Sequence, residues 1–304
     1  MTLMRIFIVL LLLGVTGCES MTAFYFHPSK PYYNDPQDFG IEYQEIVVPT
    51  EDGEQLVNWF FPASAPVKGY VVFFHGNAEN ISTHFASVYW LPEAGYSVFL
   101  ADYRGFGKST GHAVLPVVLD DMRAVFAAVV KLSHNDPQPV VVMGQSIGAS
   151  LSVLAFSHAR NFNPLNVPSR KPACMVIDSG FASFPGMVRN ALSNSWLLWP
   201  LAYPVSWLFP SNFEPISYAA DYTVPVLQFH SKDDRVVPFS QGIALRDAFQ
   251  NVVWQETTGA HIATFAQQAN RELLLSFLQG CHSGMQDKKV SFEGNLTEKS
   301  HPKR

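Results

Sequence analysis

The stretch from Gly144 to Gly148, with the pattern Gly-x-Ser-x-Gly, constrains the fold of this chain more than any other. The β-branched run 140–143 precedes it, and small residues compatible with a helix follow it. This order predicts a buried strand, a sharp turn and then a helix. A Cβ at position 144 or 148 would collide with the neighbouring strand and helix. The turn would hold Ser146 in a strained conformation, with its hydroxyl at the carboxyl end of the sheet. The alternative is a chance match in a glycine-rich loop.

Apolar runs and helical stretches alternate along most of the chain. The runs typical of strands buried on both faces span residues 70–74, 97–100, 140–143, 174–177 and 224–229, and a further strand is predicted at 251–256. The helical stretches include Val117 to Leu132 and an amphipathic segment from Phe265 to Leu278. This alternation predicts an α/β fold, in which a mostly parallel sheet is covered by helices on both faces. The 304 residues, 48% of them hydrophobic, fit one such domain over residues 41–280.

The first part of this domain follows a different pattern. Residues 41–48 and 55–60 alternate between apolar and polar side chains, with Asp52 and Gly53 as a turn between them. This pattern predicts an antiparallel hairpin at an edge of the sheet.

An insertion at about residues 181–220, after the sixth predicted strand, interrupts the alternation. It is rich in tryptophan and proline, and four prolines among aromatic residues exclude a long helix or a central strand. We expect short broken helices that lie over the active face as a lid and supply an apolar wall. The alternative is one more helix packed in the core.

The N-terminus has the features of a targeting segment. Residues 1–17 combine one positive charge with an apolar run, Ile6 to Val15, that is too short to span a bilayer comfortably. The sequence from Val15 to Cys18 resembles the lipobox of bacterial lipoproteins, which implies cleavage before Cys18 and attachment of fatty acyl groups such as palmitate there. Glu19 stands where an aspartate would favour inner-membrane retention, so we expect an outer-membrane protein of the cell envelope that faces the periplasm. An ordinary secretory signal is the alternative.

Two further segments flank the domain. Residues 18–40 are predicted to form a tether along the surface, and the polar tail 281–304 is predicted to be disordered. Cys174 begins an apolar strand and Cys281 ends the last helix, so we expect two unpaired thiols although an oxidising compartment would allow a bridge. The net charge of −5 gives no indication of nucleic-acid binding. A monomer is the default expectation.

The candidate base is the histidine of a small-residue loop. The histidines downstream of Ser146 are His158, His230, His261, His282 and His301. His261 follows the predicted strand 251–256, so its loop opens at the carboxyl end of the sheet, where Ser146 is expected. His158 lies on the helix after the turn, several turns from Ser146, and the last two histidines are in the tail. His230 is predicted to bond the backbone of the loop that carries the acid.

The candidate acid is one of three aspartates. In enzymes with this turn, the acid lies between the serine and the histidine in the sequence. Asp233 and Asp234 follow the strand 224–229, and because they are adjacent only one can point at the histidine. Asp178, at the end of the preceding strand, is a competitor, and its alternative role is to cap the turn that leads into the insertion.

Stabilisation of an oxyanion requires two backbone N–H groups. One is predicted at Ile147, directly after Ser146, and the other in the loop after the first parallel strand. Gly76 allows close approach of the backbone there, which makes the amide of Asn77 the candidate donor. His75 precedes Ser146 in the chain and is expected to brace this loop. No histidine, cysteine or carboxylate cluster has metal-ligand spacing, so no metal or organic cofactor is expected.

Five ordered motifs resemble a known family. They are His75–Ile81, Asp102–Ser109, Gly144–Gly148, Asp234 with Val237 and Pro238, and Gly259–His261. Together they resemble the Bem46-like and ABHD13/ABHD17-like serine hydrolases of the α/β-hydrolase fold, over residues 41–280. The family's Asp-x-x-Val-Pro pattern selects Asp234 over Asp233. The chain departs from the family at Asp178–Phe181, and its insertion is unusually rich in tryptophan and proline, so acyl specificity does not carry over.

The resemblance implies a serine hydrolase that cleaves carboxylic esters or thioesters through an acyl-enzyme, with the triad Ser146, His261 and Asp234. The expected substrate is a small-molecule or lipid acyl ester. Two alternatives stay open, a serine peptidase related to the aminopeptidases and a non-catalytic lipoprotein that binds a lipid or a partner.

Overall fold

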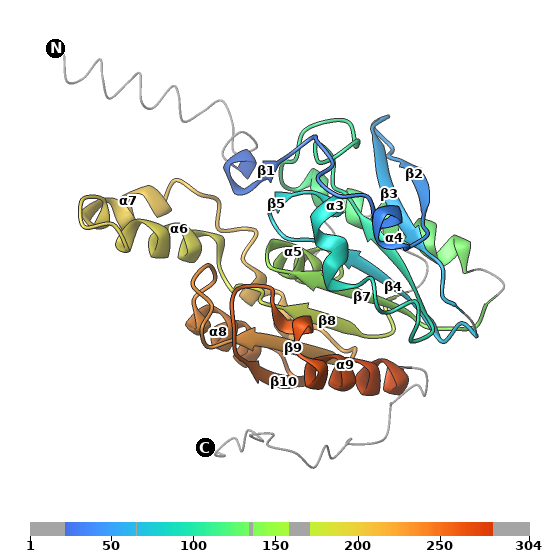
Figure 1. Cartoon of the computed structure of the whole chain (residues 1–304). Coiled ribbons are helices and arrows are strands. Elements are labelled where there is room, and N and C mark those ends of the chain that lie inside the picture. The colour runs from blue at the N-terminus through green and yellow to red at the C-terminus, as the bar shows by residue number, and fades with distance from the viewer. Residues whose placement is uncertain (1–21, 65, 134–135, 158–170, 282–304) are drawn as a thin grey trace.

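A computed structural model describes residues 22–64, 66–133, 136–157 and 171–281 (Figure 1). The predicted signal peptide, Cys18 and the tail after residue 281 lie outside the described residues, as does His158. The main sheet has eight strands in the order β10-β9-β8-β7-β4-β6-β3-β2. These are β2 (Gln44–Pro49), β3 (Gln55–Phe61), β4 (Gly69–Phe74), β6 (Tyr96–Ala101), β7 (Val140–Gln145), β8 (Met175–Asp178), β9 (Val226–Ser231) and β10 (Val252–Thr257). Two short strands, β1 (His27–Pro28) and β5 (Ala78–Glu79), pair separately.

The sheet is mostly parallel, as predicted. β2 and β3 form the expected antiparallel hairpin at one edge, and β3 pairs antiparallel with β6. The six strands from β6 to β10 in the sheet order all pair in parallel. Their carboxyl ends therefore meet at one edge, which is where the predicted site residues begin.

Helices cover both faces, because successive residues of the buried strands point to opposite sides. In β4, Val72 and Phe74 face one core cluster, whereas Val71 and Phe73 face the other. The first cluster contains residues of α4 and α5, and the second contains residues of α9. The helices are α3 (Ile81–His84), α4 (Val117–Leu132), α5 (Ile147–Ala155), α6 (Phe184–Ser193), α7 (Ala202–Ser206), α8 (Phe239–Ala248) and α9 (Gln268–Gly280). Short 3-10 turns lie at Ala23–Tyr25, Pro36–Phe39, Phe85–Ser87, Trp199–Leu201, Pro215–Ser217, Ala219–Asp221 and Thr264–Ala266.

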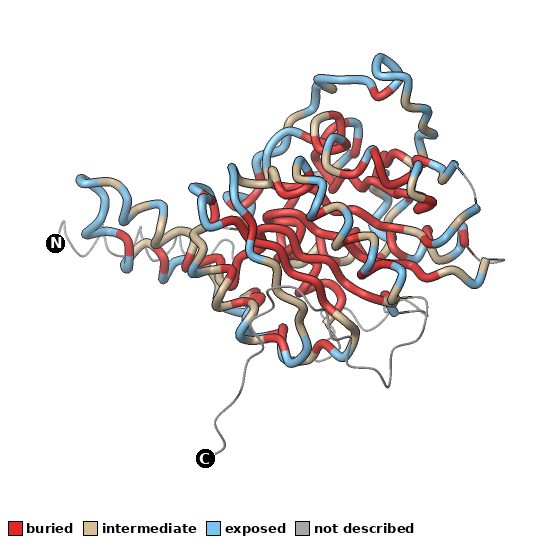
Figure 2. Tube along the Cα trace, turned by 60° about the horizontal axis from the view of Figure 1, so that its bottom comes forward, coloured by how far each residue is buried: buried red, intermediate tan, exposed pale blue. Residues whose placement is uncertain are grey.

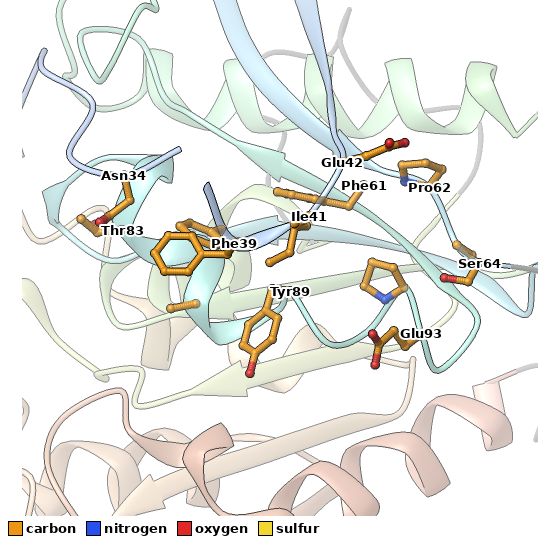
Figure 3. Close-up of a pocket in the computed structure, with 15 residues that line it drawn as sticks. Asn34, Phe39, Ile41, Glu42, Phe61, Pro62, Ser64, Thr83, Tyr89 and Glu93 are labelled. Atoms are coloured by element: carbon orange, nitrogen blue, oxygen red, sulfur yellow. The ribbon is translucent and has the colours of Figure 1, made fainter. Parts of the chain in front are cut away.

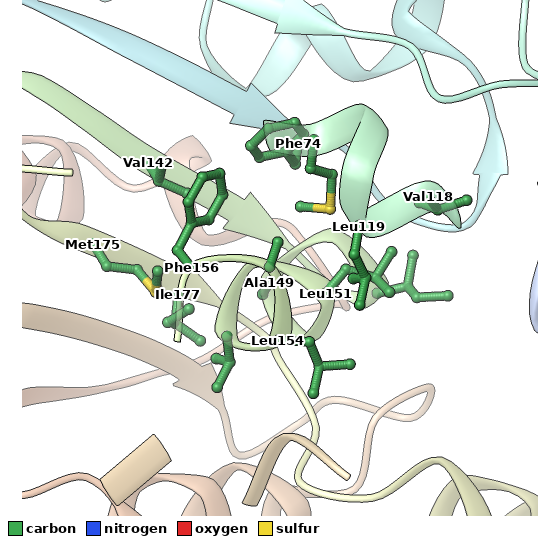
Figure 4. Close-up of a cluster of buried hydrophobic side chains, with 14 of the residues drawn as sticks. Phe74, Val118, Leu119, Val142, Ala149, Leu151, Leu154, Phe156, Met175 and Ile177 are labelled. Carbon is green, nitrogen blue, oxygen red and sulfur yellow. The ribbon is translucent and has the colours of Figure 1, made fainter. Parts of the chain in front are cut away.

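Helix α5 follows Ser146 and lies deep in the first core cluster. All nine of its residues are buried. Ala149, Leu151 and Leu154 project among side chains from β7, β8 and α4 (Figure 4). Burial of one leucine side chain contributes about 2 kcal/mol, so this packing fixes the position of the helix and of the turn that precedes it.

The insertion after β8 consists of short broken helices, as its prolines require. Phe184 and Phe213, at its base, are buried in the first core cluster. Between them, α6 and α7 pack against each other and project from the body of the molecule in both overall views (Figures 1 and 2). Trp196 is 87% exposed and Trp207 is 75% exposed. Side chains this exposed do not form the apolar wall expected of the lid.

The segment predicted as a tether packs against the domain from Thr22 onward. Thr22 exchanges hydrogen bonds with the backbone of Leu115. The Tyr25 ring lies 4.4 Å from that of Phe184 and 5.3 Å from that of Phe209, both in the insertion. In the described part of the chain, no helix is both long enough and apolar enough to cross a bilayer.

The expectation of two unpaired thiols is wrong. A disulfide joins Cys174, just before β8, to Cys281, just after α9, with their Cα atoms 5.9 Å apart. Cys174 belongs to the core cluster against which α9 packs, and Leu274 and Phe277 belong to the same cluster. The pairing therefore follows from how α9 lies on the sheet, which the sequence alone does not specify.

Candidate active site

Ser146 occupies the strained turn that the sequence predicts. Its φ is 55° and its ψ is −120°, a combination that side chains rarely adopt. A Cβ at position 144 would lie 2.5 Å from the Cα of Ala149, and one at position 148 would overlap the carbonyl oxygens of Phe74 and His75. Both glycines are therefore required by close contact between β7, β4 and α5, and the predicted reason for them is confirmed.

The side chains of Ser146, His261 and Asp234 form a continuous chain of hydrogen bonds. His261 Nε2 lies 2.9 Å from Ser146 Oγ, and His261 Nδ1 lies 2.7 Å from Asp234 Oδ2. Ser146 comes from the β7–α5 turn, Asp234 from the loop after β9 and His261 from the loop after β10. These distances allow direct proton transfer between the serine hydroxyl and the imidazole.

Backbone contacts give the two adjacent aspartates, Asp233 and Asp234, different partners. Asp234 Oδ1 accepts hydrogen bonds from the amides of Val236 and Val237, at 2.8 and 2.9 Å, which leaves Oδ2 for His261. Asp233 turns the other way and accepts from the amide of Gly259. Burial opposes ionisation of Asp234, but the bonds from His261 and from the two amides outweigh it and lower its pKa. This carboxylate therefore stays ionised beside the imidazole.

Asp178, the competing acid, is fully buried beside the site and does not bond His261. Its carboxylate accepts from Gln145 Nε2 at 2.8 Å and from Thr264 Oγ1 at 2.7 Å. Burial raises its pKa, and these two hydrogen bonds act in the opposite direction. Asp178 therefore ties the residue before Ser146 to the segment just after His261.

The residues around Gln145 were not identified from the sequence. Gln145 Oε1 accepts from Ser87 Oγ at 3.2 Å and lies 3.4 Å from His84 Nδ1. Burial, followed by the nearby His75, lowers the pKa of His84 to about 4, so this imidazole is neutral at ordinary pH. The sequence pointed to Gln145 only through its position inside the Gly-x-Ser-x-Gly pattern, because its hydrogen-bond partners lie far away in the sequence.

The two predicted oxyanion donors belong to segments that lie next to Ser146. Ile147 is the first residue of α5, so its amide is not used in the helix ladder. Gly76 lies so close that a Cβ there would be 3.6 Å from Ser146 Cβ, and the amide of Asn77 follows it directly. The Asn77 side chain accepts from the amide of His27, which connects this loop to the N-terminal segment.

His75 braces this loop, as expected. Its Nδ1 lies 2.7 Å from the carbonyl of Gly76, and its Nε2 lies 3.0 Å from Asp102 Oδ1. Asp102 also accepts from the amide of Ile81, so one buried carboxyl holds both ends of the loop. His230 likewise contacts the carbonyl of Val237 in the acid loop at 3.1 Å, as predicted.

The described residues line at least two cavities. The larger, about 770 Å³, is lined by apolar side chains that include Phe39, Ile41 and Phe85, and no triad residue lines it (Figure 3). The smaller, about 400 Å³, is lined by His84 and Ile262, so it lies directly beside His261. Across the described ranges, no three histidine, cysteine or carboxylate side chains come close enough together to hold a metal ion.

Known proteins resemble this chain in sequence and in fold. The family described as serine aminopeptidase, S33, matches residues 65–167. The uncharacterized protein YfhR of Escherichia coli K12 is 31% identical over 71% of this chain and 70% of its own length. WAV2 of Arabidopsis thaliana, an α/β-hydrolase domain-containing protein, is 24% identical over 69% of this chain and 68% of its own length.

The solved structures include an esterase of Pyrococcus furiosus, with a TM-score of 0.62 and 22% identity. The match covers 84% of this chain and 96% of the esterase. The α/β-hydrolase of Vibrio vulnificus has a TM-score of 0.61 with 17% identity, over 80% of this chain and 81% of its own. The sheet order, the strained serine turn and these relatives lead to one conclusion: the chain belongs to the α/β-hydrolase superfamily, in the family that includes YfhR.

Proposed function

We propose that the protein is a serine hydrolase that cleaves carboxylic ester or thioester bonds of acyl substrates through an acyl-enzyme. The observation that carries the proposal is the hydrogen-bonded chain from Ser146 Oγ through His261 to Asp234 Oδ2. Three separate loops bring these groups together, and the serine is held at a positive φ that costs about 1 kcal/mol or more. Such an arrangement is typical of an activated nucleophile.

In the first half of the reaction, His261 Nε2 accepts the proton of Ser146 as the hydroxyl attacks the acyl carbonyl carbon. The amides of Ile147 and Asn77 donate to the oxygen that becomes negatively charged. Asp234 accepts from Nδ1 of His261, which keeps Nε2 free to receive the proton and stabilises the imidazolium that forms. His261 then gives this proton to the leaving alcohol or thiol as the tetrahedral intermediate collapses.

In the second half, His261 removes a proton from water, which attacks the acyl carbonyl and releases the acid from Ser146. The 400 Å³ cavity beside His261 is placed to hold one part of the substrate. The similar solved structure from Pyrococcus furiosus is that of an esterase, which supports ester chemistry for this fold. Apart from the attacking water, these steps use only side chains and backbone amides of this chain.

The match to the serine aminopeptidase family supports a second candidate, cleavage of an amide bond at a peptide N-terminus. Amide and ester cleavage share the acyl-enzyme but differ in the leaving group, which must be protonated when it is an amine. Turnover of aminoacyl p-nitroanilides, with no turnover of p-nitrophenyl esters, would favour this candidate.

The test of the proposal is covalent labelling. A fluorophosphonate probe is expected to add one label to the peptide that contains Ser146, because phosphorus takes the place of the acyl carbon in the tetrahedral intermediate. Mass spectrometry of the digested protein would locate the label. The Ser146→Ala variant serves as the control and is expected to stay unlabelled while its unfolding temperature is retained. Equal labelling of the variant, or no labelling of either protein, would refute the proposal.

We further propose that Cys18 carries fatty acyl groups and holds the enzyme at the periplasmic face of the outer membrane. The lipobox-like sequence supports this proposal, and so does the disulfide between Cys174 and Cys281, since disulfides persist in oxidising compartments. Cells fed radioactive palmitate are expected to label the wild type but not Cys18→Ala. A variant that still takes up palmitate would contradict the assignment.

A further inference from the structure

An apolar surface on the insertion has no role in the proposed hydrolysis. We call residues 196–208, which run from just after α6 to just after α7, the hairpin tip. Eight of its large apolar side chains are between 39% and 87% exposed: Trp196, Leu197, Leu198, Trp199, Leu201, Tyr203, Trp207 and Leu208. Half of the exposed large apolar residues of the described chain therefore gather on one short segment that projects from the body (Figure 2). A concentration of this kind marks an interaction surface.

The absence of charged residues indicates what kind of partner the hairpin tip binds. From residue 190 to residue 213 the sequence contains no aspartate, glutamate, lysine, arginine or histidine. Arg189 and Glu214 stand at the two ends of this stretch, and Glu214 lies at the base of the insertion. A protein partner would usually be met by a rim of charged and polar groups. An uncharged surface of tryptophan, tyrosine and leucine instead matches the boundary between headgroups and acyl chains of a bilayer.

The N-terminal segment points to the same side of the molecule. Tyr25 packs on Phe184 and Phe209, so the described chain begins beside the base of the insertion. Cys18, the proposed site of lipid attachment, lies only four residues before Thr22, where the described chain begins. The proposed lipid anchor therefore precedes, by only a few residues, a segment that packs on the insertion.

We infer that the hairpin tip inserts into the interfacial layer of a lipid bilayer and orients the enzyme on the membrane surface. The tip and the N-terminal end then provide two points of attachment, which fix an orientation that one point would leave free. His27, four residues after the start of the first 3-10 turn, donates its amide to Asn77 in the oxyanion loop. The N-terminal segment therefore connects the proposed membrane-facing side to the edge of the sheet that carries Ser146. An acyl substrate in the membrane would be close to this edge.

The experiment measures tryptophan fluorescence of the full chain with vesicles of phosphatidylcholine whose acyl chains carry bromine. Three of the six tryptophans lie on the tip, so contact with bromine is expected to quench roughly half of the emission relative to unbrominated vesicles. Introducing charge by Leu197→Glu with Leu208→Glu keeps all six tryptophans. The quenching should then fall to about a third of the wild-type value or less, because a carboxylate is expelled from the hydrocarbon boundary.

A matched control carries the same charges elsewhere, as Val47→Glu with Leu132→Glu, two exposed apolar residues far from the tip. Its tryptophan emission is expected to be quenched to the same extent as that of the wild type. Near-ultraviolet circular dichroism checks that every variant is folded, and turnover of p-nitrophenyl acetate in water should be unchanged in all of them. This separates the inference from the proposed hydrolysis, because quenching is measured whether or not the ester is cleaved.

Two outcomes would overturn the inference. One is equal quenching of the wild type and the charged-tip variant, which would place the tip outside the bilayer. The other is an absence of quenching together with a concentration-dependent dimer, seen by sedimentation velocity without lipid and lost in the charged-tip variant. That result would assign the tip to contact with a second copy of the chain.

Discussion

The Asp234→Asn variant is expected to lose about 10⁴-fold in kcat/KM for a p-nitrophenyl ester. The asparagine oxygen can still accept from the amides of Val236 and Val237, so the loop keeps its shape. Its NH₂ group then faces Nδ1 of His261 and donates to it. This stabilises the tautomer with a proton on Nε2, which cannot accept the proton of Ser146. Steady-state kinetics at pH 7 to 8 would measure the loss.

Neighbouring aspartates supply the controls for this variant. Asp233→Asn changes only the acceptor for the amide of Gly259, so kcat/KM should stay within about threefold of the wild type. Asp178→Asn replaces one of two acceptor oxygens with an NH₂ donor, so it cannot accept from both Gln145 and Thr264, and we expect it to lower the free energy of unfolding by about 2 kcal/mol. Its effect on kcat/KM should be much smaller than that of Asp234→Asn. The reverse order would transfer the role of acid to Asp178.

Loss of the disulfide is expected to produce the largest change in stability. Cys281→Ser should lower the free energy of unfolding by about 4 kcal/mol, because the bridge closes a long loop in the unfolded chain, with a sequence separation of 107. The change at position 281 disturbs the core least, since Cys174 is 1% exposed whereas Cys281 is only partly buried. Urea unfolding followed by circular dichroism would give the difference.

Reduction provides an internal comparison for the disulfide. Dithiothreitol should destabilise the wild type to the level of Cys281→Ser and should leave the variant unchanged. A wild type that unfolds at the same urea concentration with and without reductant would show that the two cysteines are not joined.

Local rules explain why the central part of the fold could be predicted. The turn at Ser146 requires two glycines, because a Cβ at either position would keep β7, β4 and α5 from making close contact, and this requirement can be recognised from the five residues 144–148. The parallel strands are apolar on both faces, and α4 spans Val117–Leu132 as its apolar spacing predicts. The order of serine, acid and histidine along the sequence then predicted that His261 and Asp234 lie at the edge of the sheet where β7 ends.

The features that the sequence did not predict depend on contacts between segments that are distant in the sequence. Nothing near Cys174 or Cys281 in the sequence indicates that α9 places them 5.9 Å apart. The bonds from Asp178 to Gln145 and Thr264 span 33 and 86 residues, and no spacing rule connects such positions. The insertion 181–220 was expected to supply an apolar wall over the active face, whereas eight of its large apolar side chains, all within residues 196–208, are exposed.

The bridge between Cys174 and Cys281 makes a covalent ring of the second half of the domain. Asp234, His261 and the hairpin tip all lie inside this ring, and Ser146 lies outside it. A protease that cuts the backbone at the exposed tip would open the ring but release no fragment. The nicked protein would remain one molecule, with its nucleophile still linked to its acid and base. Only reduction of the bridge would then leave two separate polypeptides.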